Sequence, residues 1–597
     1  MRLLKLRIKN FRGLGDGECG KGIEVELDKQ DIIFLIGKNN IGKSSILYAY
    51  DYLFRNEQAS IDDFFDKNIK IPIEIEVELL ANENEVEQLN LNLKGSGNLI
   101  LKRVWDSPGR SKIFVGRYGC DPELQKETSG PVSLLKRDLP EPIWIKGMAK
   151  TQDVVGQIQS LVKCALLDRM KEDVFYKEAY SQVEQSIKNL QQSILNSGFT
   201  SQLENRIGDS LQKIFPDISL YISNQGEEFD ISSFLDKYTE VQINDSKKDV
   251  NISLDFQGHG VQRQVILSAY KECHDFFLSL KQKSSKKDNI FSFEQESLTS
   301  KTKILLIEEP ELFLHPAGVR AVQRLLYDIA RDSPFQVMCA THSPIMVDLS
   351  HHSSLVRLTR SESKHVSLCQ LRTDFDLAKD GVEDLRIIRS FNSHVCEAFF
   401  SDKVILVEGP TESVVISILL GKFREMNFYK EDWITVIDCG GKSTIPLFQK
   451  ILRYFKIPYF VFHDLDSPGD EDTDFSAWYT KNSNIENEIK NASEEGIKAT
   501  RFVFDKNFES AHPYPSSKYK GGKPYAASLK AKTWIGEWDS QGGVGPLIKK
   551  YPIVRFLWKI IQDTWDDEIH DQQWIDRRSP RDKSHISHSP GKQLELL

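Results

Sequence analysis

The sequence predicts an α/β protein of several domains. Its 597 residues are enough for about two to four domains. Near the N-terminus, an apolar run at 32–36 leads into a glycine-containing loop and a segment able to open a helix. From about residue 395, a second series of apolar runs ends in acidic residues. Strands that alternate with helices in this way are typical of α/β folds.

Residues 37–45 read GKNNIGKSS and match the phosphate-binding loop G-x-x-x-x-G-K-S. The preceding strand and the following helix are the context that such a loop requires. We expect Lys43 to reach the β and γ phosphates of a nucleotide and the Ser44 hydroxyl to hold Mg²⁺. The loop residues expected to bind the nucleotide are Gly37, Asn39, Asn40, Gly42, Lys43, Ser44 and Ser45.

Composition and charge exclude few functions. A net charge of −9 does not indicate nucleic-acid binding, but an acidic protein can still carry one basic groove. Residues 2–9 alternate apolar and basic side chains, which predicts a half-exposed strand and not a signal peptide. No apolar stretch is long enough to span a membrane, and the eight cysteines form no C-x-x-C pair. We therefore expect a cytoplasmic protein with reduced thiols and no membrane partner.

Further strands are predicted at 23–27 and 71–80. The acidic strand that a phosphate-binding loop needs does not follow for over two hundred residues, which predicts a large insertion. Apolar residues recur at helical spacing between 183 and 214. This helical segment could be an arm for dimerisation or DNA contact, or a subdomain that packs on its own core. The periodicity does not distinguish the two, because it reports burial and not the partner.

The acidic strand is predicted at 303–311, where KILLIEEPE is an apolar run ending in carboxylates. It matches the second nucleotide motif, in which Glu308 orients Mg²⁺ and Glu309 polarises the attacking water. His342 follows another buried strand that begins at residue 335. A histidine in that position could sense the γ-phosphate through a charge-assisted hydrogen bond.

The order of these motifs resembles that of the ABC-type ATPases of the SMC-like branch, over residues 1–390. The resemblance rests on the phosphate loop, G-x-G-x-Q-R at 258–263, the acidic strand, and T-H-S-P at 341–344. In that family two heads sandwich ATP, and the signature of one head contacts the nucleotide of the other. The resemblance thus implies a homodimer or higher homo-oligomer through the ATPase heads. The implied signature residues are Gly258, Gly260, Gln262 and Arg263.

A second chemical site is predicted after strands at 403–407, 433–437 and 457–462. Glu412 lies four residues after Glu408, so both carboxylates can face one point above the sheet. Asp464 and Asp466 lie on one side of an extended chain. Ligands of open α/β sheets bind at these strand ends, and converging carboxylates suit Mg²⁺ or Mn²⁺. The alternative is a set of solvated strand-end acids and helix caps.

This second half resembles a TOPRIM domain, and the two halves together resemble the OLD (overcoming lysogenisation defect) family of nucleases, over residues 1–535. That family includes the large subunit of Gabija-type anti-phage systems. The implied fold is an ABC-type ATPase head with a helical insertion, followed by a TOPRIM α/β domain. The expected parts are the ATPase at 1–145 and 221–390, the insertion at 146–220, TOPRIM at 395–535, and a C-terminal helical segment with a disordered tail at 536–597.

The resemblance also implies site residues. Two metal ions would bind at TOPRIM, one by Glu408 and Glu412, and the other by Asp464 and Asp466, which could instead bridge the ions. A later acid and a lysine are implied as well. The candidates are Glu509, with Asp505 second, and Lys523, with Lys442 or Lys530 as substitutes, whereas His463 is expected to be a neighbour and not a ligand. The expected catalytic residues are Glu408, Asp464, Asp466 and Lys523, with Glu309 for ATP hydrolysis.

These expectations together describe an ATP-regulated, metal-dependent DNA endonuclease in anti-phage defence. ATP would bind with one Mg²⁺, and the family resemblance suggests a helicase-like partner protein. The alternative is an SMC-like DNA-binding ATPase or nucleotide-dependent assembly scaffold in DNA repair, with a non-cleaving TOPRIM domain. The motifs do not determine whether ATP activates or restrains cutting, because coupling depends on two states with different affinities.

Overall fold

The structure of the chain is a computed structural model. Apart from single positions, the residues that it describes are 1–17, 20–27, 31–81, 98–125, 138–147, 242–245, 250–253, 256–262, 303–332, 335–360, 365–370, 393–428, 434–466, 476–504, 507–512, 522–541 and 543–564. The chain forms two compact units. One is Arg137–Val337, and the other combines Arg2–Lys136 with Met338–Leu597.

The larger unit begins with a six-stranded antiparallel sheet of order β2-β1-β4-β5-β6-β7. Its strands are β1 (Arg2–Lys9), β2 (Ile23–Glu26), β4 (Ile73–Leu80), β5 (Leu99–Trp105), β6 (Lys112–Arg117) and β7 (Glu123–Gln125). The predicted half-exposed strand at 2–9 is confirmed, because Leu6 and Ile8 are fully buried whereas Lys5 and Arg7 remain partly exposed.

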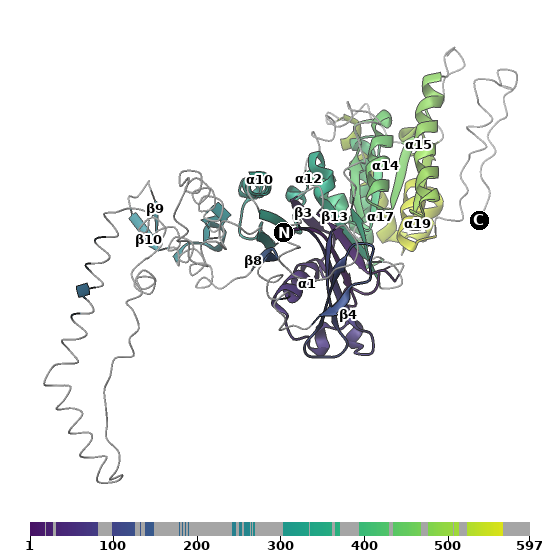
Figure 1. Cartoon of the computed structure of the whole chain (residues 1–597). Coiled ribbons are helices and arrows are strands. Elements are labelled where there is room, and N and C mark those ends of the chain that lie inside the picture. The colour runs from purple at the N-terminus through teal and green to yellow at the C-terminus, as the bar shows by residue number, and fades with distance from the viewer. Residues whose placement is uncertain are drawn as a thin grey trace, which may run out of the picture. The chain divides into compact units, whose positions relative to one another are not determined.

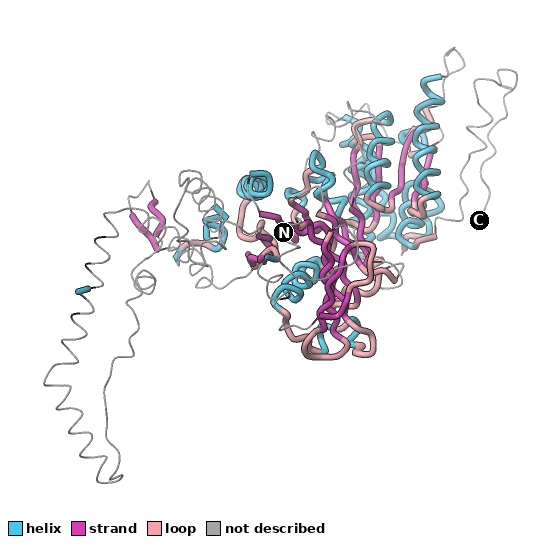
Figure 2. The backbone as a smooth tube through the Cα atoms, viewed as in Figure 1, coloured by secondary structure: helices cyan, strands magenta, loops and turns pink. Residues whose placement is uncertain are grey.

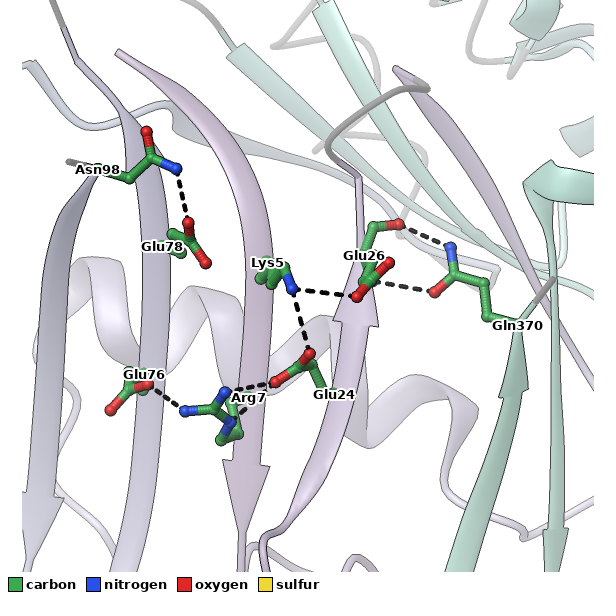
Figure 3. A network of polar contacts seen from close by, with 8 residues as sticks. All are labelled: Lys5, Arg7, Glu24, Glu26, Glu76, Glu78, Asn98 and Gln370. Carbon is green, nitrogen blue, oxygen red and sulfur yellow. Dashed lines mark hydrogen bonds and ion pairs between the residues drawn. The ribbon is translucent and has the colours of Figure 1, made fainter. Parts of the chain in front are cut away.

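The exposed face of this sheet carries ion pairs across neighbouring strands (Figure 3). Arg7 of β1 binds Glu24 of β2 and Glu76 of β4 through its guanidinium nitrogens. Lys5 lies 3.1 Å from Glu26, whose backbone N–H and C=O exchange hydrogen bonds with the Gln370 amide at 2.9 and 2.7 Å. Opposite charges on paired strands stabilise a sheet locally. The Gln370 contact ties this sheet to the next one.

That next sheet contains the strand order β14-β13-β3-β12. Its members are β3 (Ile32–Ile36), β12 (Phe335–Ala340), β13 (Leu355–Arg360) and β14 (Val366–Gln370). All five residues of β3 are buried, and β3 pairs in parallel with β13. Helix α1 (Lys43–Arg55) follows β3 after the glycine loop. The predicted sequence of strand, loop and helix is therefore confirmed (Figure 1).

The smaller unit has a parallel pair, β8 (Glu141–Ile145) and β11 (Lys303–Glu308), an antiparallel pair, β9 (Gln242–Asp245) and β10 (Val250–Ser253), and helix α10 (Pro316–Asp332). Four consecutive residues of β11, 304–307, are fully buried. The apolar residues whose spacing predicted the helical insertion, between 183 and 214, lie outside the described residues.

The C-terminal part of the larger unit is a parallel sheet of order β16-β15-β17-β18. Its strands are β15 (Lys403–Val407), β16 (Ile434–Asp438), β17 (Tyr459–Asp464) and β18 (Ala499–Phe504). Its helices are α12 (Ser393–Cys396), α13 (Pro410–Glu425), α14 (Ile445–Tyr454), α15 (Ser476–Glu494), α16 (Phe508–Ala511), α17 (Gly522–Gln541), α18 (Gly545–Lys550) and α19 (Pro552–Gln562). Figure 2 shows the long helices running alongside these strands.

Helices cover both faces of this sheet, because successive strand side chains point to opposite faces. Phe460 and Phe462 of β17 belong to one core cluster with residues of α13, α17 and α19. On the other face, the Tyr459 hydroxyl donates to the Glu488 carbonyl of α15 at 3.0 Å. The core extends to Ile561, so α19 is part of this domain's packing.

The 3₁₀ turns of the described residues are η1 (Ile61–Asp63), η2 (Phe65–Lys67), η4 (Pro344–Met346), η5 (Leu349–Ser354), η6 (Glu397–Phe400) and η7 (Lys442–Thr444). Every described helix is too short or too polar to cross a lipid bilayer. The predicted disordered tail falls mostly on residues 565–597, which lie outside the described residues.

Candidate nucleotide-binding and metal-binding sites

The phosphate loop has the backbone that its sequence predicts. Gly37 has φ 138°, and a Cβ there would lie 2.7 Å from the Leu358 carbonyl oxygen. Gly42 has φ 111°, and a Cβ there would lie 2.5 Å from a methyl group of Leu14. Both positions therefore require glycine. Asn39, Asn40 and Ser44 are exposed, whereas Ser45 is half-buried.

Lys43 lies under this loop and is only 5% exposed. Its ammonium group donates to the carbonyl oxygens of Gly37 and Lys38 at 2.7 and 2.6 Å. It also lies 3.2 Å from Nδ1 of His342, the histidine that follows β12. Burial, assisted by the Lys43 charge, lowers the pKa of His342 to about 4. The imidazole is therefore neutral at pH 7, and the structure brings these two predicted residues together.

The second nucleotide motif and the signature lie together in the smaller unit. Glu308 ends β11, and Glu309 follows with φ 46°, a left-handed conformation. A Cβ at Gly260 would meet the Phe313 carbonyl oxygen at 2.8 Å. Gln262 is 1% exposed and donates to the Gln257 carbonyl at 3.0 Å. Arg263 lies outside the described residues, and the roles of these residues remain predictions.

Carboxylates gather at the C-terminal ends of β15 and β17. Glu408 follows β15, and its Oε1 accepts a hydrogen bond from the Asp464 amide at 2.7 Å. Asp464 ends β17, and its Oδ1 accepts from the Phe508 amide at 2.8 Å. Glu412, in the first turn of α13, is 8% exposed. Adjacent parallel strands thus place acids that are distant in sequence at one edge of the sheet.

These acids resist ionisation in the metal-free protein. Burial, with the charges of Glu408, Glu412 and Asp466 added, raises the pKa of Asp464 to about 8. Burial also raises the pKa of Glu412 to about 7, with help from Glu408 and Glu509. Burial raises the pKa of Glu408, although the Asp464 amide and Lys442 act in the opposite direction. Such shifts are typical of carboxylates that share a site without a cation.

Asp466 behaves differently from Asp464. The predicted common orientation assumed an extended chain, but β17 ends at Asp464 and Asp466 has φ 50°. Asp466 is exposed, and its Oδ2 lies 3.1 Å from the buried Lys442 ammonium group. Lys442 also donates to the Asp464 carbonyl oxygen. The structure thus places Lys442, and not only the acids, at this strand end.

The late acid and lysine of the prediction are paired. Lys523 in α17 lies 2.9 Å from Oε1 of Glu509 in α16. The hydrogen bond to Glu509 raises the pKa of the exposed Lys523, and the charges of Asp464 and Glu412 contribute in the same direction. Asp505 lies outside the described residues. His463 is 1% exposed, and its Nδ1 faces the Asp464 carbonyl oxygen at 2.9 Å.

The chemistry of this cluster fits a hard divalent cation. In the described part of the chain, no group of three or more His, Cys, Asp or Glu side chains is arranged to hold one metal ion. The acids nevertheless interact electrostatically and are all oxygen donors. Mg²⁺ prefers one or two carboxylates and keeps its remaining ligands as water or substrate oxygens. A cation here would relieve the repulsion that raises these pKa values.

Sequence reasoning did not find two groups next to the cluster. One is the Phe508 amide, whose backbone N–H carries no signal in the sequence. The other is His512, a buried histidine that contacts Phe508 from the far side. A lone histidine without a motif could not be distinguished from an ordinary core residue.

The fold and the two sites define an α/β protein with a phosphate-binding loop and a separate carboxylate cluster. The AAA ATPase domain family matches residues 1–114 and 148–347, more than half of the 597 residues, and the chain belongs to that family. The family described as "Overcoming lysogenization defect protein-like, TOPRIM domain" matches residues 399–466. The predicted ATPase followed by an OLD-like TOPRIM domain is therefore confirmed.

Similar proteins carry nuclease names. The OLD nuclease of Thermus scotoductus is 22% identical over 79% of this chain and 84% of its own length. The Old nuclease of Escherichia phage P2 is 23% identical over 78% of this chain and 77% of its own length. The endonuclease GajA of Bacillus cereus strain HuB5-5 is 24% identical over 35% of this chain and 34% of its own length.

Proposed function

We propose that this chain is an ATP-regulated, divalent-metal-dependent DNA endonuclease that acts in anti-phage defence. The observation that carries the proposal is the carboxylate cluster at the ends of β15 and β17, in which Asp464 and Glu412 have strongly raised pKa values. This cluster lies in a domain that matches the OLD-like TOPRIM family. The relatives named nuclease or endonuclease support the reaction class.

The residues of the cluster have different proposed roles, according to where they lie. Glu408, Glu412, Asp464 and Glu509 are the candidate metal ligands, with Asp466 as a further ligand on the exposed side. Bound there, two Mg²⁺ or Mn²⁺ ions would supply an activated water and stabilise the oxygen that leaves phosphorus. Lys523 carries positive charge at the open edge of the cluster, where it can approach a DNA phosphate. Hydrolysis adds the water oxygen to phosphorus, breaks one phosphodiester P–O bond, and leaves a proton on the departing oxygen.

The residues of the ATPase motifs have separate proposed roles as well. Lys43 and the loop amides would hold the β and γ phosphates of ATP, and Ser44 would hold its Mg²⁺. His342 is neutral and adjacent to Lys43, so it can respond to a γ-phosphate by hydrogen bonding. Glu308 would orient the metal and Glu309 the attacking water, and Gly258, Gly260 and Gln262 would contact the nucleotide of a second head.

Contacts within the larger unit support regulation of one site by the other. Lys38 of the phosphate loop forms an ion pair with Asp402, which precedes β15. Arg357 of β13 is 5% exposed, and its guanidinium donates to the carbonyl oxygens of Phe399, Ser401 and Phe455 at 3.1 to 3.2 Å. A cavity of about 710 Å³ is lined by residues of the phosphate loop, such as Lys38, and by residues that precede β15, such as Asp402. Movement of the phosphate loop can therefore reach β15, the strand that Glu408 follows.

The proposed nuclease function also implies which molecules this chain binds. DNA is the substrate, and the ATPase heads form a homodimer or higher oligomer when ATP is bound. A helicase-like protein is a further partner of the cytoplasmic complex. Light scattering of Glu309→Gln protein, with and without ATP, measures the assembly, because this variant should retain ATP between heads. A mass that does not change with ATP would contradict assembly through the heads.

The nuclease assignment is tested on supercoiled plasmid with Mg²⁺ or Mn²⁺, with and without ATP. Glu412→Gln and Asp464→Asn should each lose at least about 100-fold of the cutting rate, because they remove candidate metal ligands. The matched control is Glu425→Gln, which changes an exposed acid at the other end of α13. It should cut as wild type does.

The pattern of results separates the alternatives. Cutting by Asp464→Asn at the wild-type rate would exclude this cluster as the nuclease site. No cutting by wild-type protein, with ATP hydrolysis intact, would favour a nucleotide-dependent scaffold with a non-cleaving TOPRIM domain.

A further inference from the structure

His512 lies outside every motif of the sequence, yet it is fully buried beside the carboxylate cluster. It caps the C-terminus of α16, the short helix that contains Glu509. The centroid of its ring lies 5.4 Å from the ring centroid of Phe504, 4.6 Å from that of Phe508 and 5.5 Å from that of Trp534. An apolar ring would fill this space equally well, so the polar atoms of the histidine need another explanation.

Both ring nitrogens of His512 have hydrogen-bond partners. The Ile553 amide, in the first turn of α19, donates to Nε2 at 3.1 Å. Because Nε2 accepts, the neutral ring carries its hydrogen on Nδ1. Nδ1 lies 3.1 Å from the Phe508 carbonyl oxygen and donates to it. Burial lowers the pKa of His512 to about 4, in agreement with a neutral ring.

The other side of Phe508 faces the cluster. Its amide donates to Oδ1 of Asp464 at 2.8 Å, and the Asp464 amide in turn donates to Oε1 of Glu408 at 2.7 Å. A series of hydrogen bonds, joined by the backbone of Phe508, therefore runs from the first turn of α19 and His512 to two candidate metal ligands. The Phe508 carbonyl oxygen also accepts the backbone N–H of His512 at 3.0 Å, so both donors to it come from His512.

We propose that His512 is a positioning residue for the nuclease site, which holds the backbone of Phe508 at its carbonyl group so that the amide of the same residue fixes the orientation of Asp464. This inference rests on the proposed role of Asp464 as a metal ligand. With Oδ1 engaged by the Phe508 amide, rotation of the carboxylate is restricted and its second oxygen keeps one direction. Groups that orient metal ligands in this way control metal affinity, often by about 10- to 100-fold.

Two substitutions in the full-length chain separate positioning from core filling. His512→Phe keeps an aromatic ring among Phe504, Phe508 and Trp534 but loses both hydrogen bonds. His512→Asn can retain a donor towards the Phe508 carbonyl but cannot reach the Ile553 amide. Binding of Mn²⁺ without nucleotide is measured by electron paramagnetic resonance of the free ion, and cutting is measured across Mg²⁺ concentrations.

We expect His512→Phe to weaken Mn²⁺ binding and to raise the half-maximal Mg²⁺ concentration by roughly 10-fold, at the low end of the range for outer-shell residues. His512→Asn should show a smaller change. The matched control is Leu557→Ala, a buried position of α19 in the same core that lacks polar contacts to the cluster. It should lower the Tm and leave the Mn²⁺ affinity unchanged.

The outcomes are distinguishable. If both His512 variants bind Mn²⁺ as wild type does, whereas Asp464→Asn binds it more weakly, the positioning role is wrong and the site assignment stands. If Leu557→Ala weakens Mn²⁺ binding as much as His512→Phe does, the effect is one of stability and the proposal is also wrong. If Asp464→Asn binds Mn²⁺ and cuts DNA normally, the proposed site itself fails.

Discussion

The phosphate loop and the carboxylate cluster belong to the same compact unit but have opposite electrostatics. In the loop, the buried ammonium group of Lys43 is held by the carbonyl oxygens of Gly37 and Lys38. In the cluster, Glu412 is buried and Asp464 half-buried, and the pKa values of both carboxyl groups are raised. One region is therefore built to receive an anion and the other a cation. A nucleotide phosphate and a divalent cation can therefore bind to the same compact unit.

The two regions also differ in how they are assembled. The residues of the loop lie within nine consecutive positions, and the two glycines with positive φ set their geometry. The acids of the cluster come from positions 408 to 509 and meet because β15, β17 and β18 are neighbours in one sheet. A local motif is therefore robust to changes elsewhere, whereas the cluster depends on the packing of the whole domain.

The largest expected effect separates the two regions by function. Lys43→Ala should lower the rate of ATP hydrolysis by roughly 100-fold, because it removes the cation that contacts the transferred phosphate. Cutting without nucleotide should remain at the wild-type rate, and its response to ATP should disappear. Arg55→Ala, in the last turn of α1, is the control. Loss of nucleotide-independent cutting in Lys43→Ala would show that the regions are not separable.

Arg357 of β13 connects the sheet that carries the phosphate loop to the residues before β15, and this contact should contribute to stability. Arg357→Met leaves several buried carbonyl oxygens without a donor and should lower the free energy of unfolding by about 3 kcal/mol. Denaturant titration measures the change. Arg360→Met, at the exposed end of the same strand, should have little effect. Equal losses from both substitutions would contradict a special role for Arg357.

The two regions should respond to pH in opposite directions in metal-free protein. The pKa of His342 is lowered from 6.5 to about 4, so its contribution to stability is complete above about pH 6.5 and is lost as the pH falls towards 4. The pKa values of Glu412 and Asp464 are raised to about 7 and about 8, so their contribution is present at low pH and is lost as the pH rises towards 8.

Thermal unfolding with a chelator, from pH 5 to 9, measures both slopes. Glu412→Gln should raise the Tm on the alkaline side, and His342→Asn should raise it on the acid side, each by a few degrees at roughly 2–4 °C per kcal/mol. Mg²⁺ should stabilise wild type more at pH 8 than at pH 6. If the Tm of Glu412→Gln matched that of wild type at every pH, ionisation of Glu412 would not destabilise the fold, and its pKa would not be raised.

The smallest expected effect concerns the ion pair between Lys38 and Asp402. Both side chains are about one-third exposed, at 36% and 32%, so removing either should cost less than about 1 kcal/mol of stability. The informative measurement is the effect of ATP on cutting in Lys38→Ala, Asp402→Ala and the double variant. Single variants with an unchanged ATP response would contradict a role for this pair in regulation.

Much of the architecture could be predicted because it depends on local patterns. The strands at 32–36 and 403–407 agree with β3 and β15, since an apolar run flanked by turn residues marks a buried strand. Asp466 shows where such reasoning ends. Its orientation was inferred from the alternation of a strand, but the strand ends two residues earlier and the backbone turns. A strand's end depends on tertiary hydrogen bonds that no local pattern records.

The two motif sets, the order of the ATPase and TOPRIM parts, and the residue types of both sites could be read from the amino-acid sequence alone. These follow from short spacings, because backbone geometry alone relates residues a few positions apart. The folded arrangement of the chain sets which acids share a site, places Lys442 beside Asp466, and pairs Lys523 with Glu509. It also connects α19 to Asp464 through His512 and Phe508. Such contacts join residues far apart in the chain, and they exist only because burial and strand order bring those residues together.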